Sequence, residues 1–166
     1  QNHLALIREI TKAQPSTQII ALCGRNEEAA TQLNAEISAM DLIKTVRVLG
    51  HQDDMFSLMQ ACDAIVARPG TGTTSEAIMA GCPIIFNTLG GVMPQEWITI
   101  KFIRARGLPI HRIKKAADIK APLLELSKSQ NAIEQAANQM MRLRPDKSPN
   151  DIFTYLTSLV KDSKVS

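Results

Sequence analysis

A glycine- and hydroxyl-rich segment has the residue types that bind an anion through the backbone. Residues 68–76 read Arg-Pro-Gly-Thr-Gly-Thr-Thr-Ser-Glu, between a short apolar run and a run of helix-forming residues. Gly70 and Gly72 let the backbone approach a ligand closely, and free N–H groups at a helix start favour a phosphate. Three hydroxyls supply further donors, those of Thr71, Thr73 and Thr74. The segment therefore predicts a phosphate-binding corner between a strand and a helix.

Two features of this segment limit the kind of nucleotide that it could bind. It lacks the lysine of a nucleoside-triphosphatase loop, and its glycine spacing differs from G-x-G-x-x-G. No acidic residue ends the following strand to bind a ribose, which disfavours a dinucleotide. Glu76 has two interpretations that the residues alone leave open: it could bind ribose hydroxyls, or it could close a capping box with Thr73 at the helix start.

Two earlier strand-to-helix junctions also carry polar groups. Arg25 follows Gly24 and could grip a phosphate through paired hydrogen bonds, although an exposed turn residue is an equal alternative. His51 and Gln52 could lie along the edge of a base, but the residues alone favour a plain loop in which a following aspartate caps a helix.

A fourth junction follows the last of the apolar runs in the central part of the chain. Gln95 and Glu96 come after a glycine-rich stretch and start a helical run. A planar amide beside a carboxylate suits a hydroxyl-rich ligand such as a sugar. The alternative is an acidic residue that complements the dipole of its helix. Trp97, the only tryptophan, is expected in the core.

The elements that must position these residues follow from the spacing of apolar side chains. Short apolar runs predict strands at 18–23, 45–49, 63–67, 83–87 and 108–113. Helical spacing predicts a helix that ends near Pro15, a short helix around 55–59, and helices at 27–40, 74–80, 95–106, 116–127, 131–143 and 149–161. Strands that alternate with helices predict an α/β domain with a mainly parallel, Rossmann-like sheet flanked by helices.

Composition narrows the classes of partner. The net charge of +3 and the 4% aromatic content do not suit a nucleic-acid-binding surface, so no nucleic-acid partner is expected. The three cysteines contain no C-x-x-C pair, which predicts free thiols and no metal site. No apolar run approaches the roughly 20 residues that span a bilayer, so a cytoplasmic protein is expected. Basic residues between Lys101 and Lys120 suit a solvated helix face or an anionic membrane surface.

Several motifs occur in the order and spacing of a known family. They are Asp53-Asp54-Met55, Cys62-Asp63-Ala64-Ile65-Val66, residues 68–77, Ala80-Gly81-Cys82-Pro83-Ile84-Ile85 and Pro94-Gln95-Glu96. This pattern resembles the carboxy-terminal domain of family 28 glycosyltransferases, which include monogalactosyldiacylglycerol synthases and the peptidoglycan N-acetylglucosaminyltransferase. Cys23-Gly24-Arg25-Asn26 resembles the galactolipid-synthase version of an earlier strand end. The resemblance covers residues 19–113.

The resemblance implies the carboxy-terminal half of the glycosyltransferase-B architecture. It also implies that the chain is the donor-binding domain of a UDP-sugar-dependent glycosyltransferase, an enzyme that transfers a hexose to a lipid-linked or other acceptor. The residues that match donor-binding positions are Arg25, His51, Gln52, Arg68, Gly70, Thr71, Gly72, Thr73, Glu76, Gln95 and Glu96. Among them, Gly70 to Thr73 would hold the diphosphate and Glu76 the ribose. The UDP-sugar would be a substrate, with no further cofactor and no metal, and the reaction would invert the anomeric centre.

The chain also departs from the family pattern. The first strand with its glycine-rich turn, and the amino-terminal lobe with the acceptor site and catalytic base, have no counterpart in residues 1–166. The sequence is therefore expected to be a single-domain fragment that is inactive alone, and its catalytic residues are unknown. Two alternatives stay open: an enzyme similar to UDP-N-acetylglucosamine 2-epimerase, and a non-catalytic nucleotide-binding module.

Overall fold

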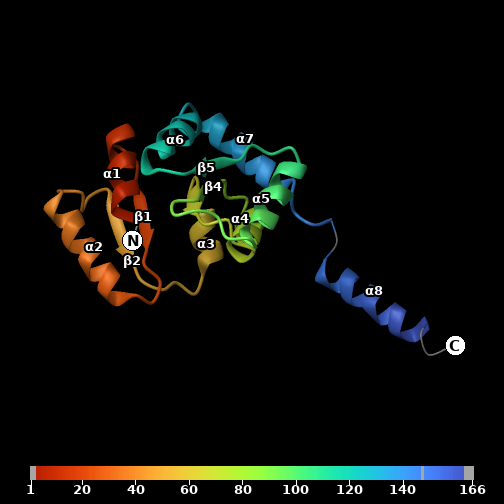
Figure 1. The fold of residues 1–166 in the computed structure, drawn as a ribbon. Coiled ribbons are helices and arrows are strands. Elements are labelled where there is room, and N and C mark those ends of the chain that lie inside the picture. Colours follow the sequence, from red (N-terminus) through yellow and green to blue (C-terminus); the bar gives the residue numbers. More distant parts are fainter. Residues whose placement is uncertain (1–2, 147, 163–166) are drawn as a thin grey trace.

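The computed structural model describes residues 3–146 and 148–162 (Figure 1). In chain order the elements are α1 (His3–Ala13), β1 (Ile19–Leu22), α2 (Glu27–Ala39), β2 (Val46–Leu49), α3 (Met55–Gln60), β3 (Ile65–Ala67), α4 (Thr71–Ala80), β4 (Ile84–Asn87), α5 (Glu96–Ala105), β5 (His111–Ile113), the 3-10 helix η1 (Ala116–Ile119), α6 (Lys120–Leu126), α7 (Gln130–Met141) and α8 (Pro149–Asp162). The predicted alternation of strands and helices is confirmed.

The strands pair only in parallel, but they form two separate sheets. β1 pairs with β2, and β3, β4 and β5 pair in that order. A helix of 10 to 13 residues connects the two strands of each parallel pair, as parallel pairing requires. The predicted parallel sheet is confirmed, and its division into two pieces was not foreseen. Because all pairs are parallel, the carboxyl ends of neighbouring strands meet at one edge of each sheet, where the polar junctions lie.

Helix α1 joins the two sheets. Its Ile7 packs in a cluster with Ala21 and Leu33 of the first sheet's half. Its Leu6 and Ile10 pack in another cluster with Ile85 and Ile113, which belong to the second sheet. A third and larger cluster fills the space between the second sheet and helices α3, α4, α5 and α7. The two parts of the described chain therefore share a core through side chains and not through strand pairing.

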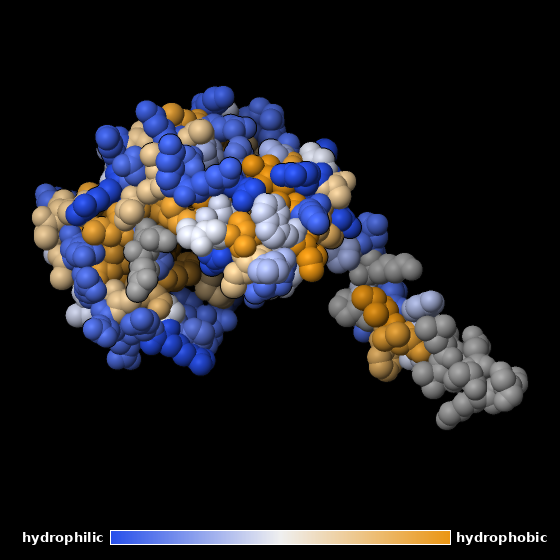
Figure 2. All heavy atoms as spheres, viewed as in Figure 1, coloured by the Kyte–Doolittle hydropathy of each residue, from blue (hydrophilic) through white to orange (hydrophobic). Residues whose placement is uncertain are grey.

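The strands that end each sheet are less covered than the pattern predicts. Ile20 on β1 is 42% exposed and Val66 on β3 is 36% exposed. Each of these strands has one hydrogen-bonded neighbour among the described residues, so one edge of its backbone pairs with no described strand. Figure 2 shows a hollow on this face of the molecule, between the part that holds β1, β2 and α2 and the part that holds α3 and α4.

Glycine fixes the far end of α4, the helix that carries the candidate phosphate corner. Gly81 ends α4 with φ of 73°, in the left-handed region that favours glycine. A Cβ atom added to Gly81 would lie 2.9 Å from the Cγ of Met141, at the end of α7. Arg144 donates a hydrogen bond of 2.7 Å to the carbonyl of Met79. Helix α4 is therefore held against α7 at the end opposite to the corner.

Helix α8 extends away from the rest of the chain (Figure 1). Ile152, Phe153 and Leu156 are more than half exposed on it, and Figure 2 shows the corresponding apolar surface. None of the described helices is both long enough and apolar enough to cross a membrane.

Candidate functional site

The β3 corner, residues 68–73, is an uncapped helix start at the carboxyl end of β3. Helix α4 begins at Thr71, and Gly70 is its N-cap with no side-chain capping bond. The first amide of α4 that is bonded belongs to Thr74, which donates to the Gly70 carbonyl at 3.1 Å. Within the described chain, the amides of Thr71, Gly72 and Thr73 donate to no acceptor. Three free N–H groups at the positive end of a helix dipole form an anion-binding arrangement.

The glycines of the β3 corner are not required by the fold. Gly70 has φ of −75° and ψ of 144°, which any residue adopts. A Cβ atom at Gly70 or Gly72 would meet nothing within 4 Å. A glycine inside a helix costs about 0.5–1 kcal/mol relative to alanine, and Gly72 lies in the first turn of α4. The space beside these residues is open, and the fold alone gives no reason to keep glycine there.

One predicted hydroxyl and one alternative for Glu76 are wrong. Thr74 is only 2% exposed and its Oγ1 has no hydrogen-bond partner, because its side chain turns toward the core. Thr73 is not the N-cap, since α4 starts two residues earlier, and so Thr73 and Glu76 form no capping box. Glu76 lies exposed one turn after Gly72, on the same helix face. Its role toward ribose stays a prediction.

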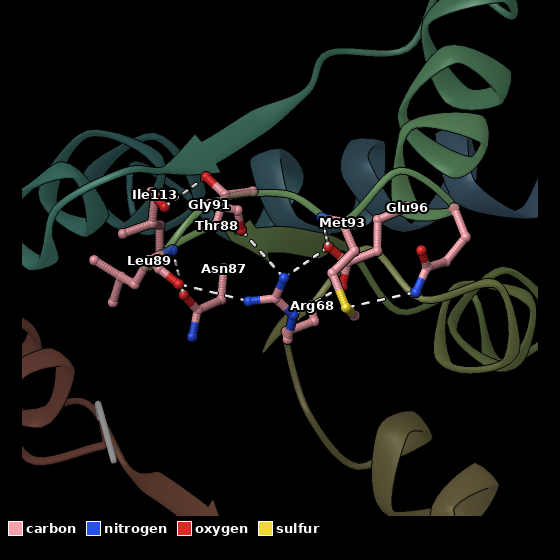
Figure 3. Close-up of polar contacts among 9 residues, drawn as sticks. Arg68, Asn87, Thr88, Leu89, Gly91, Met93, Glu96 and Ile113 are labelled. Atoms are coloured by element: carbon pink, nitrogen blue, oxygen red, sulfur yellow. Dashed lines mark hydrogen bonds and ion pairs between the residues drawn. The ribbon is translucent and has the colours of Figure 1, made fainter.

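Arg68 and Glu96 face each other across two loops (Figure 3). Arg68 Nε donates to Glu96 Oε1 at 2.8 Å, and Nη2 donates to Oε2 at 2.7 Å. The Arg68 side chain is 42% exposed, whereas that of Glu96 is 4% exposed. The hydrogen bond from Arg68 is the main cause that lowers the pKa of Glu96, and the same bond raises the pKa of Arg68. This paired geometry is typical of a strong charge-assisted contact.

The β4 loop, residues 88–95, leads from β4 to Glu96 at the start of α5 and is built around this ion pair. Arg68 Nη2 also donates to the Gly91 carbonyl at 3.1 Å, and the Met93 amide donates to Glu96 Oε2 at 2.8 Å. The Thr88 hydroxyl donates to the Ile113 carbonyl at 2.8 Å, which ties the loop to β5. Gln95 is exposed, and among the described residues its side-chain amide bonds only to the Met93 sulfur, at 3.5 Å. Gln95 therefore keeps its carbonyl oxygen for another partner.

The β2 loop, residues 50–54, lies at the carboxyl end of the first sheet and has fewer contacts than the β4 loop. His51 Nε2 lies 3.3 Å from Asp53 Oδ1, and the Asp53 side chain is almost fully exposed. The Gln52 amide donates to the neighbouring His51 carbonyl at 2.9 Å. Asp54, not Asp53, caps α3 by accepting the Ser57 amide at 2.9 Å. These contacts are local, so the loop is not tied to another element.

The predicted residues thus fall into two groups. Arg25 is exposed in the turn after β1, beside the β2 loop, since the Gly24 carbonyl lies 3.5 Å from the Cβ position of Gly50. Arg68, Gln95 and Glu96 come together with the β3 corner. No hydrogen bond or ion pair between described residues links one group to the other.

Some residues that shape the site were not singled out from the sequence. Asn87 Oδ1 accepts the Leu89 amide at 3.1 Å and starts the β4 loop, and Thr88 anchors it to β5. An asparagine or threonine directly after a strand is a turn signal, and that signal was available in the sequence. Within the part of the chain that the structure describes, no group of three histidine, cysteine, aspartate or glutamate residues could hold a metal ion.

The comparison with known families decides the assignment. The model described as the glycosyltransferase family 28 C-terminal domain matches residues 2–93, more than half of the chain. The chain belongs to this family. The matched residues of the family 28 domain include the β2 loop and the β3 corner, and they end just before Gln95 and Glu96.

Named relatives of the family 28 domain are lipid glycosyltransferases. The chain is 29% identical over 140 residues to the processive diacylglycerol beta-glucosyltransferase of Staphylococcus carnosus (strain TM300). The matched region covers 84% of this chain and 34% of that protein. The chain is 38% identical over 95 residues to the chloroplastic monogalactosyldiacylglycerol synthase of Spinacia oleracea. The matched region covers 57% of this chain and 17% of that protein. The chain thus spans about a third or less of the length of these relatives.

Solved structures share the fold of the family 28 domain at low identity. A structure of the Anabaena protein HepE in complex with UDP and glucose matches 85% of this chain and 39% of that chain, with a TM-score of 0.65 and 15% identity. A mutant O-GlcNAc transferase of Thermobaculum terrenum matches 86% of this chain and 28% of that chain, with a TM-score of 0.66 and 17% identity. The domain therefore has the Rossmann-like α/β fold of one half of a glycosyltransferase-B enzyme.

Proposed function

We propose that this domain binds the UDP-sugar donor of an inverting, metal-independent glycosyltransferase that transfers a hexose to a lipid acceptor. The observation that carries the proposal is the β3 corner, with three free amides, two glycines in open space and an exposed glutamate one turn later. The names of the relatives support a diacylglycerol acceptor and a glucosyl or galactosyl group. The isolated domain is expected to be inactive.

The chemistry of the corner suits a departing nucleoside diphosphate. Displacement at the anomeric carbon leaves negative charge on the β-phosphate, and donors that already point at that charge lower the barrier. The amides of Thr71, Gly72 and Thr73 would supply these donors together with the dipole of α4. Arg25 would add a positive charge from the first sheet. The base that activates the acceptor would come from an amino-terminal lobe, so this domain contributes donor binding and leaving-group stabilisation.

A glycine substitution tests the proposal with effects of opposite sign on stability and binding. Gly72→Ala places a methyl group in open space, so the free energy of unfolding should rise by about 0.5–1 kcal/mol. The same methyl group would stand between the helix start and a diphosphate. We expect the affinity for UDP, measured by calorimetry, to fall by about tenfold. Urea unfolding measures the stability change.

Ser75→Ala is the matched control, because Ser75 is exposed on the same helix and has no proposed contact. It should leave UDP affinity unchanged. If Gly72→Ala stabilises the domain and binds UDP as the unmodified chain does, the β3 corner does not hold the diphosphate and the proposal is wrong.

A further inference from the structure

Arg68 has almost no hydrogen-bonding capacity left for a ligand. A guanidinium carries five N–H donors. In addition to its two bonds to Glu96 and the one to Gly91, Arg68 Nη1 lies 3.5 Å from the Leu89 carbonyl. Four of the five donors therefore have a partner among the described residues, and one N–H of Nη1 remains. The charge of Arg68 is also neutralised by the adjacent carboxylate, so Arg68 adds little positive potential to a phosphate site.

The carboxylate of Glu96 also has most of its hydrogen-bonding capacity in use. It accepts both bonds from Arg68 and a third from the Met93 amide, and only 4% of the Glu96 side chain is exposed. A buried carboxylate with these three partners is not available to the hydroxyl of a sugar. The two residues therefore bind each other and the backbone of the β4 loop.

The β4 loop needs such anchoring because its own sequence is flexible. Gly90 and Gly91 have φ of 79° and 97°, and a Cβ at either would meet nothing within 4 Å. Glycines lose more conformational freedom on ordering than other residues. Packing around these two residues cannot hold the loop, whereas the ion pair contacts the loop at Leu89, Gly91 and Met93. The next residue of the loop with an exposed polar side chain is Gln95, directly before Glu96, and its carbonyl oxygen bonds to no described residue.

We propose that the Arg68–Glu96 pair is a positioning device that joins the β3 corner to the β4 loop and fixes Gln95 toward the sugar of a bound UDP-sugar. The inference rests on the proposed donor site and assigns Arg68 and Glu96 a role that differs from direct donor binding. If the proposal is right, the ion pair determines how much more tightly the domain binds a UDP-sugar than UDP. The affinity for UDP itself depends instead on the helix start of α4.

Four variants of the chain test the proposal: Arg68→Met, Arg68→Lys, Glu96→Gln, and the double variant Arg68→Met with Glu96→Gln. Calorimetry gives the dissociation constants of UDP, UDP-glucose and UDP-galactose. We expect the preference for the tighter UDP-sugar over UDP to fall by about fivefold in each single variant and no further in the double variant, because both changes remove one interaction. UDP affinity should change by less than about twofold.

Arg68→Lys separates positioning from charge. Lysine keeps the positive charge but cannot bind a carboxylate and a carbonyl with a planar fork, so the sugar preference should be lost as in Arg68→Met. If Arg68 instead binds the diphosphate, Arg68→Met should weaken UDP itself and lysine should largely restore it. If Glu96 and Arg68 bind the ligand separately, their effects should add. Either of these results overturns the proposal.

Amide hydrogen exchange on the ligand-free chain tests the pair independently of nucleotide binding. Exchange at Gly91 and Met93 should rise by about tenfold or more in Arg68→Met and in Glu96→Gln. Glu125→Gln is the control, because Glu125 pairs with His111 at 3.7 Å outside the site. Unchanged exchange in the β4 loop would refute the positioning role. A chain that shows the expected exchange but binds neither UDP nor UDP-sugar would refute the proposed function and leave the loop-anchoring role standing.

Discussion

The β4 loop and the β2 loop both follow a parallel strand and both carry predicted donor-binding residues, but they are held in different ways. In the β4 loop the amides of Thr88, Leu89, Gly91 and Met93 all donate hydrogen bonds. In the β2 loop the backbone amides of residues 51–54 donate none to any described residue. Hydrogen bonds therefore hold the backbone of the β4 loop without a ligand, whereas the backbone of the β2 loop has no such bonds.

This difference has a consequence for binding. Ordering a loop when a ligand binds costs conformational entropy, whereas a loop that is already fixed avoids that cost. The side of the site near the β4 loop should therefore contribute more to selectivity, because its groups meet the ligand at fixed distances. The side near His51 and Gln52 can adapt to the ligand but loses free energy when it does so.

Substituting a glycine in each loop should show the largest contrast. Gly91→Ala forces a side chain into a backbone with φ of 97°, so we expect a loss of about 1–2 kcal/mol in the free energy of unfolding. Gly50 has no such φ, and a Cβ there would make an ordinary contact of 3.5 Å. Gly50→Ala should change stability by less than about 0.5 kcal/mol. Equal losses in urea unfolding would mean that the two loops are equally constrained.

Glu76 extends the comparison between fixed and unfixed residues. It is exposed like His51 in the β2 loop, but its backbone position is fixed by helix α4. Glu76→Ala should reduce the affinity for UDP by about tenfold, with little change in melting temperature since the side chain has no partner among the described residues. A uracil ligand without ribose hydroxyls should bind the variant and the unmodified chain alike. Loss of thermal stability without loss of UDP affinity would show that Glu76 serves the helix only.

The smallest expected effect is the response of the β4 loop to acid. The Arg68 hydrogen bond lowers the pKa of Glu96, so the ion pair is intact above the ordinary glutamate pKa and is lost as the pH falls through the lowered folded value. Trp97, the only tryptophan, follows Glu96 directly. We expect its fluorescence to change only below about pH 4, and the change to be absent in Glu96→Gln. A transition at the same pH in that variant would assign it to another group.

The sequence predicts those features that depend on local patterns. The strand predicted at 18–23 and the helix predicted at 27–40 correspond to β1 (Ile19–Leu22) and α2 (Glu27–Ala39), since apolar spacing and capping act over a few residues. The helix predicted at 74–80 begins instead at Thr71. Glycine and threonine are poor helix formers, so the first turn of α4 was interpreted as a loop.

Other features depend on contacts between distant residues and could not be predicted from one sequence. Arg68 and Glu96 are 28 positions apart, and no local pattern indicates that they pair. The expected burial of Trp97 is wrong, because its side chain is 39% exposed and the Arg112 guanidinium lies 4.9 Å from its ring centroid. The expected free thiols are confirmed for Cys23, Cys62 and Cys82.

The division of the sheet also has a mechanical consequence. In the described chain no strand ladder crosses from β1 to β3, and α1 connects the two halves by apolar contacts. Packed side chains can slide by small amounts without breaking directional bonds, so apolar packing, and no strand ladder between described residues, fixes the angle between the halves. A ligand that contacts Arg25 on one half and Gly72 on the other would therefore also constrain the angle between the two halves.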